Sequence, residues 1–88
     1  MIKTKITITN KAGLHARAAA KLVSAASAFS SNIEIGNDEK FVDGKSILSI
    51  MLLAAGQGSE LDLIIEGEDE EQALKALLDL IDNRFGED

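Results

Sequence analysis

The sequence predicts an α+β fold: an open-faced sandwich with a four-stranded antiparallel sheet and three helices on one face. The first observation is the order of the elements, because segments with strand-like and helix-like spacing follow one another as βαββαβα. The second is that the helices need a common apolar cover, which one face of a sheet supplies. The third is size. The 88 residues suit a single domain, residues 1–88, since domains usually span roughly 100–200 residues.

The N-terminal part is predicted to form a strand followed by a helix. Apolar and polar residues alternate over residues 2–9, which is typical of a half-buried strand. A loop containing Gly13 follows, and the spacing then changes to that of a helix over residues 16–29. The apolar stripe of this helix consists of Ala19, Leu22, Val23, Ala26 and Phe29. One stripe of this kind indicates a helix with a single buried face.

The middle of the chain is predicted to form a hairpin and a short helix. Residues 32–35 and 40–42 are expected to be strands that pair around a turn at residues 36–39. The helix is expected over residues 46–55, with Gly56 near its end. The hairpin thus supplies two of the four strands.

The C-terminal part is predicted to form the fourth strand and the last helix. The strand covers residues 61–66, and Asp69 is expected to cap the helix, with Gln72 completing a variant of the capping box. The predicted buried stripe of this helix consists of Ala73, Leu74, Leu77, Leu78, Ile81 and Phe85. It completes the cover of the sheet.

Composition excludes several classes of function. Fifteen acidic and nine basic residues give a net charge of −6, which repels nucleic acid, and the absence of Trp and Tyr removes stacking platforms. No run approaches the roughly 20 apolar residues of a membrane span, and no secretion signal is visible, so a cytoplasmic protein without membrane insertion is expected. With one His and no Cys, no metal site is predicted.

The most informative segment is Gly13-Leu14-His15-Ala16-Arg17, at the start of the first predicted helix. The first amide groups of a helix have no partner within it and carry partial positive charge, so they can bind a phosphate-sized anion. Arg17 can add a charge-assisted contact, and the helix end favours the neutral, nucleophilic imidazole. Because no second catalytic group is visible, a capping or surface histidine remains the simpler interpretation of these residues alone.

Three segments together have a more specific likeness. Residues 13–17, followed by Ala19–Val23, resemble the active-site segment of the HPr family, the histidine-containing phosphocarriers of the bacterial sugar phosphotransferase system. The segment Val42-Asp43-Gly44-Lys45-Ser46-Ile47 resembles the regulatory-serine segment of the same family. Residues 66–70 are similar to its entry into the last helix. The resemblance spans nearly the whole chain.

The resemblance implies roles for individual residues. His15 would accept a phosphoryl group on Nδ1, with the Ala16 N–H and the Arg17 side chain contacting the group in transit. Enzyme I, charged from phosphoenolpyruvate, would be the donor, and a sugar-specific enzyme IIA domain the acceptor. An HPr kinase/phosphorylase would phosphorylate Ser46 in hosts that have one. The protein would carry a phosphoryl group and would not be a stand-alone enzyme, and no cofactor is expected.

Three positions depart from the family's usual pattern. Ala18 stands where proline is common. Alanine keeps the helix and adds an N–H to its first turn, so we expect the geometry to survive with slightly less rigidity. Ser24 and Ser27 stand where many relatives carry lysine. The docking face is therefore less basic, and electrostatic steering towards an acidic partner is expected to be weaker.

The second predicted helix has more apolar residues than one buried face needs. The docking patch is predicted to consist of Ile47, Leu48, Met51, Ala16 and Ala20, with Arg17, Lys21 and Lys45 around it. Such a patch marks a contact site, and a small interface suits a partner that must leave quickly. Ser46 would cap this helix, and a phosphate there would oppose docking. A carrier that presents one face to several partners is expected to work as a monomer.

Three other interpretations stay open. The first is a nitrogen-branch relative of HPr, which the sequence does not separate from the sugar branch. The second is a regulatory binding module that acts through the Ser46 surface, although such a module has no need of the His15 nucleophile. The third is a small α+β ligand-binding domain without phosphate chemistry.

Overall fold

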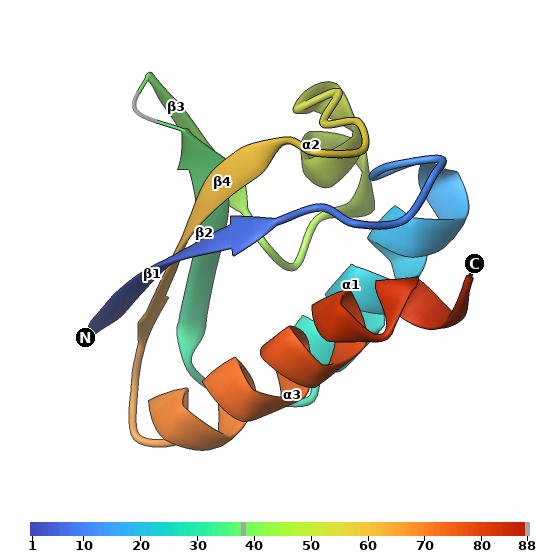
Figure 1. The fold of residues 1–88 in the computed structure, drawn as a ribbon. Helices are drawn as coiled ribbons and strands as arrows, with labels where there is room; N and C mark the ends of the chain where they lie inside the picture. The colour runs from blue at the N-terminus through green and yellow to red at the C-terminus, as the bar shows by residue number, and fades with distance from the viewer. Residues whose placement is uncertain (38, 88) are drawn as a thin grey trace.

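The computed structural model describes residues 1–37 and 39–87 and confirms the predicted α+β fold (Figure 1). Its elements are β1 (Ile2–Thr7), α1 (Ala16–Ser27), β2 (Asn32–Asn37), β3 (Lys40–Asp43), α2 (Ile47–Leu52), β4 (Glu60–Glu66), α3 (Glu70–Asp82) and a 3₁₀ turn, η1 (Arg84–Gly86). Within the described residues, four strands form one antiparallel sheet in the order β1-β4-β2-β3. The turn η1 is the element that the sequence did not predict.

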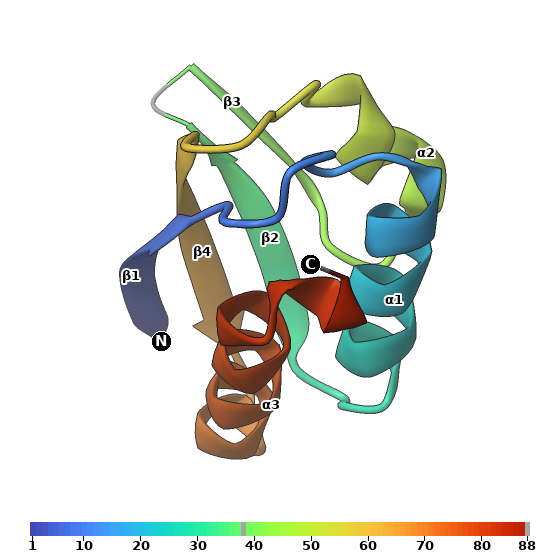
Figure 2. The ribbon, with the colours of Figure 1, turned by 45° about the vertical axis from the view of Figure 1, so that its right-hand side comes forward.

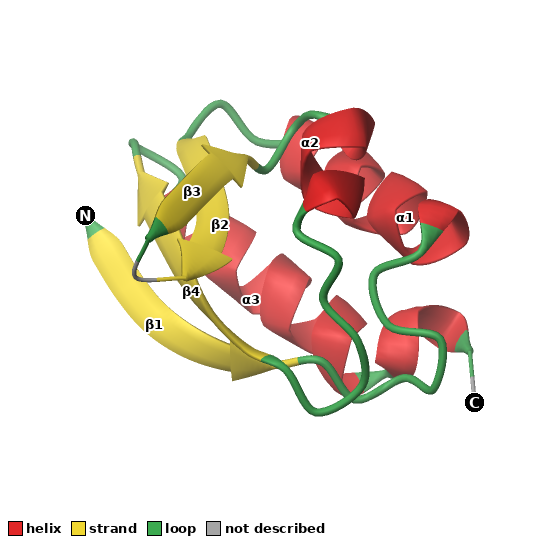
Figure 3. Cartoon of the chain, turned by 90° about the horizontal axis from the view of Figure 1, so that it is seen from above, coloured by secondary structure: helices red, strands yellow, loops and turns green. Residues whose placement is uncertain are grey.

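The sheet and the helices form two layers, with α1, α2 and α3 on the same side of the sheet (Figures 2 and 3). Helix α1 contacts both α2 and α3. The largest fully buried apolar side chains between the layers are Phe85, Ile8, Ile35, Ile50, Leu63, Ile65 and Leu77. In the part of the chain that the structure describes, no helix has the length and apolar character needed to cross a membrane.

The hairpin is longer than predicted, because β2 continues to Asn37 instead of ending at residue 35. Gly36, expected to begin the turn, pairs with Phe41 in β3. A Cβ atom at Gly36 would lie 2.0 Å from the carbonyl oxygen of Lys40. Glycine therefore lets the two backbones approach closely enough to pair. The predicted turn residue Asp38 lies outside the described residues.

Two helices end earlier than predicted. Helix α1 ends at Ser27 instead of residue 29, and α2 ends at Leu52 instead of residue 55. Ala54 has a φ of 52°, in the left-handed region, and its N–H donates to the Met51 carbonyl at 3.0 Å. A left-handed residue stops a helix, so α2 ends before Gly56, where the stop was expected.

The predicted capping box of α3 is wrong. Asp69 is the N-cap residue, but its carboxylate makes no capping bond and instead accepts hydrogen bonds from Ser30 and Ser31. The reciprocal contact is made by Glu70, whose Oε1 accepts the N–H of Gly67 at 3.1 Å. The Asp69 carboxylate thus ties the end of the α1–β2 connection to the start of α3, a contact between segments far apart in the sequence.

We expect Asp69→Asn to destabilise the fold at neutral pH and to lose that effect in acid. The Ser31 hydroxyl, and next the Ser30 N–H, lower the pKa of Asp69 from 3.8 to about 2. A lowered pKa gives stability that is present above pH 3.8 and is lost as the pH falls through about 2. Thermal unfolding should show a Tm roughly 5 °C below that of the unmodified protein at pH 7.

The control for this prediction is Glu68→Gln, which removes an exposed neighbouring carboxylate and should leave the Tm nearly unchanged. The Tm difference caused by Asp69→Asn should shrink as the pH is lowered from neutral towards 2. A difference that stays constant over this range would show that the charge of Asp69 contributes nothing.

Candidate functional site

His15 lies at the mouth of α1, as its N-cap residue. Its backbone is extended, with φ −76° and ψ −178°, and its Nδ1 accepts the N–H of Arg17 at 3.3 Å. The carbonyl of His15 accepts the N–H of Ala19 at 2.8 Å and so begins the helix. The side chain is 34% exposed. The imidazole is therefore accessible and lies beside the first amides of α1, as predicted.

The loop before His15 is held against the C-terminal side of α2. The N–H of Leu14 donates to the Ala55 carbonyl at 2.8 Å, and the Leu14 side chain is buried. Gly13 has a φ of 70°, and a Cβ atom there would lie 2.5 Å from the same Ala55 oxygen. The loop needs glycine at this position both for its left-handed backbone and for the close approach. These contacts fix the direction in which His15 enters the helix.

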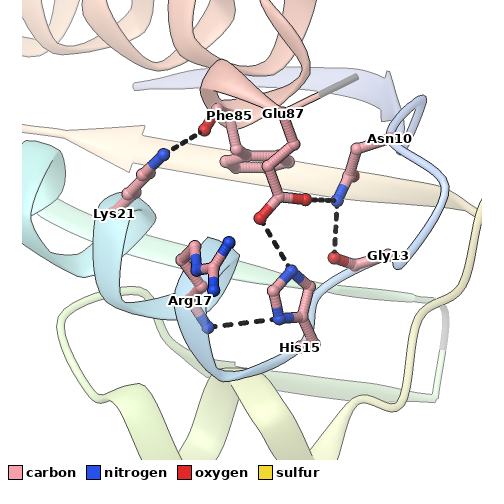
Figure 4. Close-up of polar contacts among 7 residues, drawn as sticks. All are labelled: Asn10, Gly13, His15, Arg17, Lys21, Phe85 and Glu87. Carbon is pink, nitrogen blue, oxygen red and sulfur yellow. Dashed lines mark hydrogen bonds and ion pairs between the residues drawn. The ribbon is translucent and has the colours of Figure 1, made fainter.

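The other nitrogen of the ring contacts the C-terminal segment (Figure 4). His15 Nε2 lies 2.8 Å from Oε2 of Glu87, and Oε1 of Glu87 accepts Nδ2 of Asn10 at 2.9 Å. The same Asn10 amide group donates to the Gly13 carbonyl at 2.8 Å. The hydrogen bond from Asn10 is the largest cause that lowers the pKa of Glu87, and the nearby His15 and Arg17 lower it further. Glu87 is thus a carboxylate held against the imidazole.

Asn10 and Glu87 were not among the predicted site residues. Glu87 is separated from His15 by 72 positions in the sequence, and no local pattern relates the two. Asn10 looked like an ordinary loop residue, although it is fully buried. A buried Asn between a strand and the start of a helix indicates that its side chain makes hydrogen bonds that hold the loop. It does not reveal which residues are its partners.

Positive charge lies on the solvent side of the site. Arg17 is exposed in the first turn of α1, next to exposed Ala16. With Nε2 facing the Glu87 carboxylate and Nδ1 accepting the N–H of Arg17, Nδ1 is the nitrogen that points toward the positive helix end. In its neutral form the imidazole can present the Nδ1 lone pair to an incoming phosphoryl group. Among the described residues, no group of three or more His, Cys, Asp or Glu side chains could hold a metal ion.

The predicted docking residues lie on the exposed sides of α1 and α2. Leu48 is 70% exposed, Ile47 and Met51 are also exposed, and so is Ala20 on α1. Leu52 was not predicted, yet it is 63% exposed and adds to the apolar surface. We call Ile47, Leu48, Met51 and Leu52 the α2 patch.

Two lysines expected around this patch have contacts within the molecule. Lys21 Nζ donates to the Phe85 carbonyl at 2.6 Å, and Lys45 Nζ donates to the Phe29 carbonyl at 2.8 Å. Each ammonium group is thus fixed by a backbone oxygen. Lys21 in particular links α1 to the C-terminal segment that carries Glu87.

Ser46 is the N-cap residue of α2. Its Oγ accepts the N–H of Ser49 at 3.3 Å, and its side chain is partly exposed. The serine therefore has the capping role that its position predicted. It also lies immediately before Ile47 and Leu48, so a modification of its hydroxyl would change the edge of the α2 patch.

Comparisons with known proteins match nearly the whole chain. A family model described as "PTS HPr component phosphorylation site" matches residues 2–83. The chain is 56% identical over 84 residues to the phosphocarrier protein HPr of Pseudomonas aeruginosa, a match that covers 94% of this chain and 93% of the relative. It is 50% identical over 88 residues to the corresponding protein of Xylella fastidiosa, with 100% and 99% covered. The crystal structure of HPr-C-His from Thermoanaerobacter tengcongensis matches with a TM-score of 0.95 and 52% identity, over 100% of this chain and 99% of that one.

Proposed function

The chain belongs to the HPr family of phosphocarriers, and from this premise we propose that it accepts the phosphoryl group on Nδ1 of His15. The single observation that carries the proposal is the partly exposed imidazole at the mouth of α1, with Nδ1 beside the Arg17 amide. A neutral imidazole nitrogen is a competent nucleophile, and a helix N-terminus stabilises the anion that it receives. A reversible carrier needs a nucleophile and a site that stabilises the bound phosphoryl group, and in this proposal Nδ1 of His15 has both.

The transfer is a displacement at phosphorus. The lone pair of His15 Nδ1 forms a bond to phosphorus while the bond from phosphorus to the donor's leaving atom breaks, and that electron pair stays with the donor. The Arg17 N–H, which donates to Nδ1 in the free protein, is then released to donate to a phosphoryl oxygen. The Ala16 N–H and the Arg17 guanidinium supply further positive charge. Discharge to the acceptor is the same step in reverse.

The donor in this proposal is enzyme I, charged from phosphoenolpyruvate, and the acceptor is an enzyme IIA domain, both in the cytoplasm. The exposed apolar side chains of the α2 patch and of Ala20 support the docking part of the proposal, because they lie on α2 and α1, two helices in contact with each other, and α1 begins at the reactive ring. Transfer from one protein to another requires an interface small enough to dissociate rapidly. One such face on a monomer serves donor and acceptor in turn.

The function is tested by incubating the protein with phosphoenolpyruvate and a catalytic amount of enzyme I. We expect intact-mass spectrometry to show a gain of one phosphoryl group, which is lost when an enzyme IIA domain is added. Running the sugar-branch and nitrogen-branch donors in parallel decides which branch the protein serves. No gain in mass with either donor would remove the carrier function.

Phosphorylation of Ser46 is proposed as the regulation of docking, with an HPr kinase/phosphorylase as the enzyme responsible. A phosphate adds a charge of about −1.5 to −2 and is tolerated at a helix N-terminus. We expect Ser46→Asp to slow phosphoryl transfer from enzyme I by about tenfold, because negative charge beside Ile47 and Leu48 opposes docking. The rate is measured by quenching the transfer reaction at successive times and determining, by intact mass, the fraction of protein that has gained a phosphoryl group.

The matched control for Ser46→Asp is Gln72→Glu, which adds the same charge on an exposed position of α3. It should leave the transfer rate unchanged, and both variants should keep the circular dichroism spectrum of the unmodified protein. Equal rates for all three proteins would contradict a regulatory role of negative charge at Ser46.

A further inference from the structure

The contact between His15 and the C-terminal segment points to a further residue that acts in the reaction. We propose that Glu87 is a positioning residue that holds the proton on Nε2 of His15 and covers that nitrogen, so that phosphoryl transfer is confined to Nδ1. This inference rests on the proposed function and deepens it. It assigns to Glu87 a task that neither Arg17 nor the helix amides can perform.

The two contacts of the imidazole specify one tautomer. An ionised carboxylate only accepts hydrogen bonds, so Nε2, 2.8 Å from Glu87 Oε2, must carry the hydrogen. An amide N–H only donates, so Nδ1 must present its lone pair to Arg17. The other carboxylate oxygen of Glu87 is occupied by Nδ2 of Asn10. The carboxylate is thus held on both oxygens, and in its neutral form the ring carries its one hydrogen on Nε2.

Contacts of the C-terminal segment, residues 84–87, hold Glu87 beside the His15 ring. Phe85 is fully buried, and its carbonyl accepts Lys21 Nζ at 2.6 Å. Arg84 and Phe85 have φ values of 53° and 55°, two consecutive left-handed residues that are not glycine. Such a backbone persists only where surrounding contacts impose it. Its effect here is to turn the chain after α3 and to bring Glu87, with a side chain only 15% exposed, to His15.

The contact matters because of the charge that the ring gains during transfer. When Nδ1 forms its bond to phosphorus, the ring that keeps its Nε2 hydrogen becomes a cation, and the Glu87 carboxylate stabilises that charge. When the phosphoryl group leaves, the electron pair of the Nδ1–phosphorus bond returns to Nδ1. Because Nε2 has kept its hydrogen, the leaving group is neutral imidazole instead of the much poorer imidazolate. The carboxylate therefore assists loading through its charge, and it assists discharge by keeping the hydrogen on Nε2.

The inference is tested with potassium phosphoramidate, a small donor that phosphorylates imidazole without a protein partner. In the unmodified protein we expect phosphorus only on Nδ1, as read from ³¹P and ¹⁵N NMR spectra. In Glu87→Ala we expect phosphorus on Nε2 as well, and a loading rate at Nδ1 about tenfold lower. The Nε2 hydrogen of the free protein should be observable in the ¹H spectrum and should disappear into solvent exchange in this variant.

Two further variants separate charge from shape. Glu87→Gln can still accept the Nε2 hydrogen through its amide oxygen, although its NH₂ group then faces the Nδ2 donor of Asn10 and that contact is lost. It should therefore keep the selectivity for Nδ1 but load more slowly than the unmodified protein. Glu68→Gln removes an exposed carboxylate at the start of α3 and should change neither quantity. Thermal unfolding of each variant identifies any loss of rate that comes from loss of structure.

The outcomes distinguish this inference from the proposed function. If the unmodified protein takes no phosphoryl group from either phosphoramidate or enzyme I, the carrier function itself fails. If it loads at Nδ1 and a folded Glu87→Ala variant loads at the same rate with the same selectivity, the carrier function stands and the role of Glu87 is overturned.

Discussion

Replacing His15 with asparagine is expected to abolish phosphoryl acceptance from enzyme I and phosphoenolpyruvate, a loss of at least about a thousandfold. The imidazole supplies the nucleophile, and the carboxamide of asparagine does not. Asparagine is nevertheless among the preferred N-cap residues, so the substitution keeps the start of α1. The measurement is the fraction of protein that gains one phosphoryl group by intact mass, followed over time.

The comparison variant for this prediction is His15→Ala, which removes both the nucleophile and the cap. It should be as inactive as His15→Asn. In addition, its free energy of unfolding in urea should be about 1 kcal/mol lower than that of His15→Asn, because the cap is lost. A substantial gain in mass by either variant would mean that another residue accepts the phosphoryl group. The mass of proteolytic fragments would then locate it.

Replacing Phe85 with alanine is expected to cost about 3–5 kcal/mol of the free energy of unfolding. The side chain is fully buried, and its removal leaves a cavity that the packed layers cannot fill by small movements. This is a large fraction of the roughly 5–15 kcal/mol that stabilises a typical domain. Urea unfolding followed by circular dichroism measures the change.

The matched control for Phe85 is Leu48→Ala, which removes an apolar side chain that is 70% exposed. It should change the free energy of unfolding by less than about 0.5 kcal/mol, while slowing transfer from enzyme I if Leu48 belongs to the docking surface. A cost below about 1 kcal/mol for Phe85→Ala would show that the C-terminal segment is not an integral part of the core.

Most of the fold could be predicted because the signals that define it are local. Alternation over residues 2–9 and the helical spacing after residue 16 each arise from neighbours in the sequence. The ends of the elements were harder. Helix α2 ends at Leu52, just before the left-handed Ala54, and alanine is not a recognisable stop signal. The start of α3 was predicted, but its capping contact was not, because the Asp69 carboxylate bonds to Ser30 and Ser31, a preference decided by tertiary contact.

The candidate site divides in the same way. His15 and Arg17 could be identified because they stand two positions apart at the start of one helix, and helix geometry alone brings them to the same end. Glu87 could not, because its position depends on the turn after α3 and on the buried Phe85. Its contact with the ring is a product of the whole fold. Asn10, which holds the carboxylate, shares this dependence.

The central claim is that His15 Nδ1, at the mouth of α1, is the atom that carries the phosphoryl group. The most direct measurement is a ³¹P and ¹⁵N NMR spectrum of the unmodified protein after loading by enzyme I and phosphoenolpyruvate. We predict a single phosphorus bonded to Nδ1, together with a shifted amide signal for Arg17. Phosphorus on Nε2, or on a serine hydroxyl instead of the ring, would contradict the claim.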